Sequence, residues 1–147
     1  MPKRKKKMKI AGEKAANENK LAKQIKKTAE GLYYISETDA EILPFVGKKS
    51  GTVTSEEVLK QIEGAVDTPV EERDFTGFFA RLTEMQDWFG DEEKATAEKF
   101  AELKDLLEKN LSNLKVFKIG NINLDIYIVG LNSDNILMGI KTKAVET

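Results

Sequence analysis

The amino-acid sequence predicts an α+β fold, a three-layer α-β-α sandwich with a mainly antiparallel sheet. The last third of the chain alternates apolar and polar residues in three segments joined by short turns, which predicts an antiparallel meander. The segments before it carry apolar residues mostly at helical spacing. Because a sheet buries its apolar faces only against another layer, the helices must pack on this meander.

The length of 147 residues suits a single domain with a substantial core. Hydrophobic residues make up 40% and charged residues 33% of the chain, as in ordinary soluble globular proteins. No apolar stretch is long enough to cross a bilayer, and no apolar segment follows the basic N-terminus as in a secretory signal. We therefore expect a cytoplasmic protein, or a nuclear one if the host is eukaryotic.

The first helix is expected from about Asn19 to Tyr34, with Gly31 near its end. Its apolar stripe consists of Leu21, Ile25, Ala29 and Leu32. The next segment, YYISETDAEILPF, changes period and predicts a strand followed by a loop, because Pro44 cannot lie inside a helix.

Three more helices are expected before the meander. The second begins after Thr54, which has the capping-box spacing with Glu57, and the third is a short Phe-rich helix capped by Asp74. The longest runs from about Asp91 to Leu111, with acidic residues in its first turn. Between the second and third helices, AVDTPVEERD predicts an edge strand or a bend because it contains Pro69.

The meander consists of the segments LKVFKIG, INLDIYIV and NILMGIKTKAV. Turns are expected at Gly120-Asn121 and over Leu131–Asn135, where Gly, Asn, Asp and Ser gather. The middle segment alternates most regularly, which predicts a half-buried strand.

Charge is distributed unevenly along the chain. Residues 1–27 carry eleven Lys and Arg against two Glu, a net charge of +9, and residues 28–147 carry thirteen against twenty-three acidic residues, a net charge of −10. We expect a basic flexible arm at residues 1–18 and a folded domain at residues 19–147. The arm is a solubilising tail, a nuclear localisation signal or a weak electrostatic contact with nucleic acid. The last alternative would use Lys3, Arg4, Lys5, Lys6 and Lys7.

The sequence contains neither histidine nor cysteine. The usual general base near neutral pH, the thiol nucleophile and the common zinc ligands are therefore excluded. Carboxylates and lysines can still do acid–base chemistry, but the acids are spread along helix surfaces. We expect a protein that is not an enzyme and needs no cofactor.

Trp88 lies in a connecting segment, TEMQDWFGDEEK, just before the longest helix. Two hypotheses stand equal: the indole fills a gap between helices, or it anchors a protein interface with Asp87 beside it as a charged companion. Thr147, the last residue of the sequence, offers a hydroxyl and an α-carboxylate, an oxygen pair that suits a hard cation such as Mg²⁺. Glu37 lies in the loop after the first strand. The alternative interpretation is that Glu37 and Thr147 are ordinary solvent-exposed surface residues.

The sequence resembles the nuclease A inhibitor family. The resemblance is carried by GLYYISETD…LPF, DFTGFFARLTEMQDWFGDEE and LDIYIVG…GIKTKAVET, in matching order and spacing from about Asn19 to the final residue. The most specific parts are Ser36-Glu37, Gln86-Asp87-Trp88 and Val145-Glu146-Thr147. The resemblance implies an α-β-α sandwich that inhibits a sugar-nonspecific, Mg²⁺-dependent DNA/RNA endonuclease of the ββα-metal type by blocking its active site.

The resemblance also implies which residues contact the nuclease. Glu37 and Thr147 would reach its catalytic metal region, and Asp87 and Trp88 would form the rest of the contact surface. The inhibitor would hold no metal of its own, would be monomeric alone and would form a 1:1 complex.

Other functions stay open at this stage. A nucleic-acid-binding adaptor would require residues 1–27 and would lose binding steeply with salt. A carboxylate enzyme would need acids that converge in a pocket. A protein-interaction module with this basic arm and a partner that is not a nuclease fits the sequence equally well.

Overall fold

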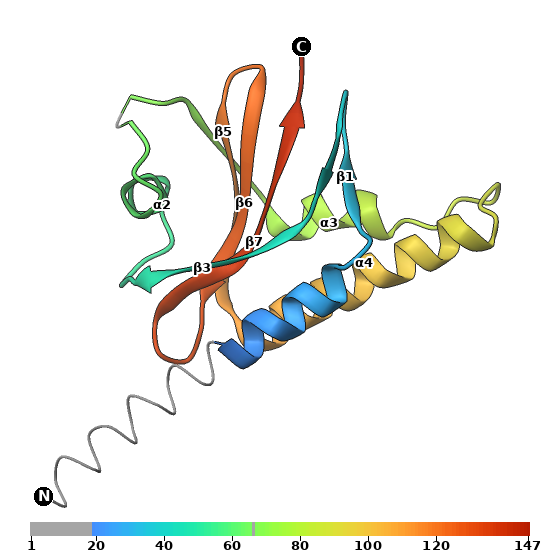
Figure 1. The fold of residues 1–147 in the computed structure, drawn as a ribbon, viewed down its shortest axis with the longest axis horizontal. Coiled ribbons are helices and arrows are strands. Elements are labelled where there is room, and N and C mark those ends of the chain that lie inside the picture. Colours follow the sequence, from blue (N-terminus) through green and yellow to red (C-terminus); the bar gives the residue numbers. More distant parts are fainter. Residues whose placement is uncertain (1–18, 66) are drawn as a thin grey trace, which may run out of the picture.

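The computed structural model describes residues 19–65 and 67–147 (Figure 1). The expected basic arm, residues 1–18 with Lys3 to Lys7, lies outside the described residues. The first helix is described over residues 19–29. The other elements are β1 (Tyr33–Ile35), β2 (Asp39–Glu41), β3 (Leu43–Lys49), α2 (Ser55–Gln61), β4 (Val70–Arg73), α3 (Phe75–Thr83), α4 (Asp91–Asn110), β5 (Ser112–Gly120), β6 (Asn123–Leu131) and β7 (Ile136–Val145).

Within the described residues the strands form a five-stranded antiparallel sheet in the order β3-β7-β6-β5-β4 and a separate hairpin of β1 and β2. The predicted meander is confirmed as β5-β6-β7, in which Ile128 lies between Val116 and Ile140. The Pro69 segment leads into β4, and Pro44 lies in β3. Both are edge strands, where a residue without an N–H is tolerated.

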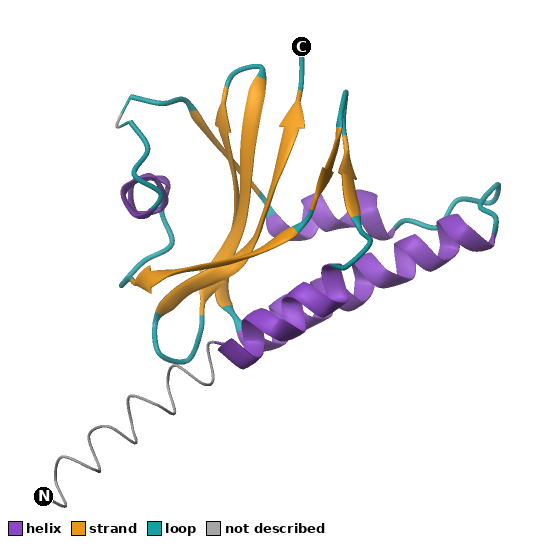
Figure 2. Cartoon of the chain, viewed as in Figure 1, coloured by secondary structure: helices purple, strands orange, loops and turns teal. Residues whose placement is uncertain are grey.

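Helices cover both faces of the five-stranded sheet, so the predicted three-layer sandwich is confirmed (Figure 2). The first helix, α3 and α4 pack on one face over a large core that includes Ile25, Phe79 and Leu103. The short helix α2 covers the other face over a smaller cluster around Val58. In the part of the chain that the structure describes, no helix combines the length and apolarity needed to span a membrane.

The N-cap residues of two helices are confirmed, although the Glu57 carboxylate accepts from the Gln61 amide and does not complete the capping box with Thr54. The Thr54 hydroxyl accepts a hydrogen bond from the Glu57 N–H at 3.2 Å, and the Asp74 carboxylate accepts one from the Gly77 N–H at 2.8 Å. Each cap satisfies an amide that the first helical turn leaves without a partner. The longest helix, α4, ends within one residue of its predicted bounds.

The expected end of the first helix was wrong. The helix ends at residue 29, because Gly31 adopts a left-handed conformation with φ of 80° and turns the chain. Tyr33 and Tyr34 then lie in β1, where the Tyr34 ring stacks on the Phe78 ring with 5.5 Å between the ring centroids. The expected strand and loop are instead three strands, β1, β2 and β3, with a three-residue turn at 36–38.

Candidate functional site

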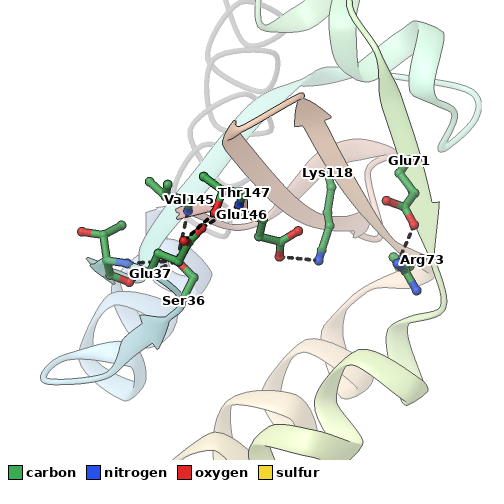
Figure 3. A network of polar contacts seen from close by, with 9 residues as sticks. Ser36, Glu37, Glu71, Arg73, Lys118, Val145, Glu146 and Thr147 are labelled. Atoms are coloured by element: carbon green, nitrogen blue, oxygen red, sulfur yellow. Dashed lines mark hydrogen bonds and ion pairs between the residues drawn. The ribbon is translucent and has the colours of Figure 1, made fainter.

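The chain beyond β7 is fixed between two turns (Figure 3). On one side, the Val145 N–H donates to the Ser36 hydroxyl at 3.0 Å, and the Glu37 N–H donates to the Val145 carbonyl at 3.2 Å. On the other side, the Glu146 N–H donates to the Ile122 carbonyl at 2.9 Å. The β1–β2 turn and the β5–β6 turn thus hold the last residues of the sequence in place.

Glu37 and Thr147 contact each other although 110 residues separate them in the sequence. The Thr147 N–H donates to one carboxylate oxygen of Glu37 at 2.6 Å, and the Thr147 hydroxyl donates to the other at 2.7 Å. Both residues are exposed. The hydroxyl donates its hydrogen bond to Glu37, so the lone pairs of its oxygen stay available to a cation outside the protein.

The Thr147 hydrogen bonds lower the pKa of the Glu37 carboxyl below its ordinary value. The hydroxyl contributes most and the backbone N–H next, while slight desolvation opposes them. Both donors stabilise the ionised form, so Glu37 carries its negative charge at neutral pH. The site therefore presents a negative carboxylate and an oriented hydroxyl oxygen at one exposed point.

This pKa gives a direct test of the contact. In an NMR titration of the side-chain carboxyl, Glu37 should titrate below an ordinary glutamate, and Thr147→Val should move its pKa upward because the hydroxyl donor is lost. Because the folded pKa is depressed, the contact stabilises the fold above the unfolded pKa, and this stabilisation disappears as pH falls through the folded pKa. An unchanged Glu37 titration in the Thr147→Val variant would show that the two side chains are apart in solution.

A second polar contact supports the same segment. The Lys118 ammonium on β5 lies 2.9 Å from the Glu146 carboxylate (Figure 3). Lys118 thereby fixes the residue before Thr147. Figure 3 also shows the separate ion pair of Arg73 with Glu71 on β4, at 2.6 Å. Lys118 was not predicted as a supporting residue, since a lysine in an alternating strand carries no distinguishing local pattern. Ser36 was part of the family resemblance, but its role in holding Val145 was not predicted.

Asp87 and Trp88 lie in the connection between α3 and α4. The Trp88 side chain is 72% exposed and makes an edge-on contact with the Phe89 ring at 4.7 Å. The hypothesis that Trp88 fills a gap between helices is therefore wrong. Figure 1 shows this connection at the far end of α4 from the first helix, and well away from the C-terminus. The structure does not join Asp87 and Trp88 to Glu37 and Thr147, so a partner that touches all four must span both regions.

Among the residues that the structure describes, no group of three or more acidic side chains converges as a metal site. Glu37 and Thr147 form a pair, and a single carboxylate with a hydroxyl is a poor cage for Mg²⁺ by itself. The pair is suited instead to complete the coordination of a cation that another molecule already holds.

Comparison with known proteins identifies the family of the chain. A search of curated proteins finds no match. A family model described as nuclease A inhibitor-like protein matches residues 19–147, nearly the whole chain. The match includes the β1–β2 turn, the α3–α4 connection and the segment after β7. The chain belongs to the nuclease A inhibitor-like family.

Proposed function

We propose that the chain inhibits a sugar-nonspecific, Mg²⁺-dependent DNA/RNA endonuclease by binding at its active site and blocking it. The observation that carries this proposal is the exposed Glu37–Thr147 pair, in which a carboxylate orients a hydroxyl oxygen outward. Membership of the nuclease A inhibitor-like family supplies the class of partner. The inhibitor is proposed to be monomeric alone and to bind its nuclease 1:1.

The proposed mechanism is occupation of the nuclease's metal region. Mg²⁺ prefers oxygen ligands, and a nucleic-acid substrate would supply a phosphate oxygen to the catalytic ion. The Thr147 hydroxyl oxygen would approach that position, while the Glu37 charge replaces part of the phosphate charge. The hydrogen bonds around residues 145–147 fix this segment before binding, so little conformational entropy is lost on association.

The charge of the folded part favours this partner. Residues 19–147 carry seventeen Lys and Arg against twenty-three acidic residues, a net charge of −6. A nuclease binds a polyanion, and its active-site cleft is therefore positive. Opposite charges steer the two proteins together and raise the association rate, an effect that salt weakens.

The test is a titration of a purified ββα-metal, sugar-nonspecific endonuclease with the chain in the presence of Mg²⁺. We expect loss of DNA cleavage at one inhibitor per nuclease, and weaker inhibition by Glu37→Gln. The matched control is Glu102→Gln, which removes one exposed negative charge from α4 and should inhibit like the wild type. Full cleavage in the presence of excess wild-type chain would refute inhibition of this nuclease class. Equal potency of the two variants would refute the role of Glu37.

A further inference from the structure

Each of the two turns that hold residues 145–147 carries an exposed isoleucine. Ile35, the last residue of β1, is 73% exposed and directly precedes Ser36, whose hydroxyl holds Val145. Ile122, in the β5–β6 turn, is 52% exposed, and its carbonyl holds Glu146. Each exposed isoleucine thus belongs to a segment that hydrogen-bonds to the residues just before Thr147.

Neither isoleucine side chain serves the core. In β1 the neighbouring Tyr34 points inward and stacks on Phe78, so the alternation of the strand places Ile35 outward. Ile122 belongs to neither buried cluster. A single exposed isoleucine is ordinary on a protein surface. Two in the segments that hold residues 145 and 146 make a local pattern beside a fixed polar pair.

The size of a specific complex argues that these residues are needed. A standard protein interface buries about 800 Å² on each partner, far more than Glu37 and Thr147 supply alone. The energetically important centre of an interface is surrounded by contacts that exclude water. Exclusion of water also strengthens the attraction between a carboxylate and a cation, because the local dielectric constant falls.

We propose that Ile35 and Ile122 are partner-contacting residues that pack against apolar surface beside the nuclease's metal site and help to exclude water from the Glu37–Thr147 pair. This inference rests on the proposed function and extends its contact surface. The occupant is the nuclease itself, because the isoleucines are continuous with the proposed contact through the hydrogen bonds to residues 145–147. Isoleucine is also stiff at χ1, so it loses little side-chain freedom when it is covered.

Val46 on β3 provides a matched control. It is also β-branched and is 45% exposed, close to Ile122. It lies opposite Met138, near the start of β7, whereas Val145, at the far end of that strand, adjoins the site. Val46 and Ile122 therefore have similar side chains and similar exposure. Val46 lies beside the start of β7, whereas Ile122 lies beside its end.

The experiment measures the dissociation constant and dissociation rate for a purified ββα-metal endonuclease with Ile35→Ser, Ile122→Ser, the double variant and Val46→Ser. We expect each isoleucine variant to bind about ten-fold more weakly, mainly through faster dissociation, with unchanged melting. Val46→Ser should bind like the wild type. If a serine variant melts lower, Ile35→Thr and Ile122→Thr keep the strand propensity and should still weaken binding.

The outcomes separate this inference from the proposed function. Inhibition by the wild type, with a double variant that binds as tightly as Val46→Ser, would overturn the role of the isoleucines and leave the inhibitor function intact. A wild-type chain that binds no such endonuclease would overturn both. If Val46→Ser weakened nuclease binding as much as the isoleucine variants do, the loss would come from lower surface apolarity in general. That result would also overturn the inference.

Discussion

Thr147→Val should weaken inhibition of the nuclease by roughly 30- to 150-fold, about 2–3 kcal/mol, while the melting temperature falls only slightly. Valine keeps the shape of threonine but removes the hydroxyl that donates to Glu37 at 2.7 Å and would offer its oxygen to the partner's Mg²⁺. Thr147 is exposed and belongs to neither buried cluster, so its side chain contributes little to the fold beyond its contact with Glu37. Inhibition assays and thermal melts on the same preparation make the measurement.

Two further variants sharpen this prediction. Thr147→Ser keeps the hydroxyl and should inhibit nearly as well as the wild type. Glu37→Ala should weaken inhibition as well, but the double variant should lose less than the sum of the single losses because both residues serve one hydrogen-bonded pair. A Thr147→Val protein that inhibits at full potency would eliminate the hydroxyl from the mechanism, whatever other surface the inhibitor uses.

The elements with a long, regular period were predictable from the sequence. Ile126 and Ile128 alternate along β6 and are buried on the face toward the three helices. Asp74 and Asp91 mark the starts of α3 and α4 because a carboxylate favours the first turn or its cap. In these cases local preference and tertiary packing agree, and the sequence pattern carries enough information.

The region from Gly31 to Leu43 was less predictable for a physical reason. Leu32 continues the apolar stripe of the first helix and is buried, yet it lies past the helix end. Burial of one residue does not distinguish a helical turn from a chain that doubles back into β1. The deciding feature is the left-handed conformation of Gly31, which a glycine permits without requiring.

The candidate site depends on contacts that local patterns do not encode. Glu37 and Thr147 lie 110 positions apart in the sequence, and only the pairing of the β1–β2 turn with the end of β7 brings them together. Composition and periodicity did not predict this contact. The family resemblance pointed to the residues, and the hydrogen bonds give the geometry. The exposure of Trp88 was similarly undecided by sequence, because tryptophan is common both in buried gaps and at protein interfaces.

Trp88→Ala should cost about 2 kcal/mol or more of affinity for the nuclease, roughly 30-fold, with little change in stability. The indole is 72% exposed, and within the fold it contacts the edge of the Phe89 ring. Such an aromatic contact is worth about 0.5–1.5 kcal/mol, which bounds the loss of stability. Large exposed aromatic side chains supply much of the energy of an interface when a partner covers them.

Phe79→Ala should have the opposite effect and serves as the control. Phe79 is fully buried between α3 and the sheet, with Phe75 at 4.9 Å and Phe78 at 5.9 Å. Its removal leaves a cavity and should lower the free energy of unfolding by about 3–5 kcal/mol. At a temperature where this variant is still folded, its nuclease affinity should equal that of the wild type, because Phe79 does not reach the surface. Melting and binding measured on both variants should therefore show a loss of affinity for Trp88→Ala and a loss of stability for Phe79→Ala. If Trp88→Ala instead lost stability as Phe79→Ala does, or kept wild-type affinity, the α3–α4 connection would not be part of the nuclease contact surface.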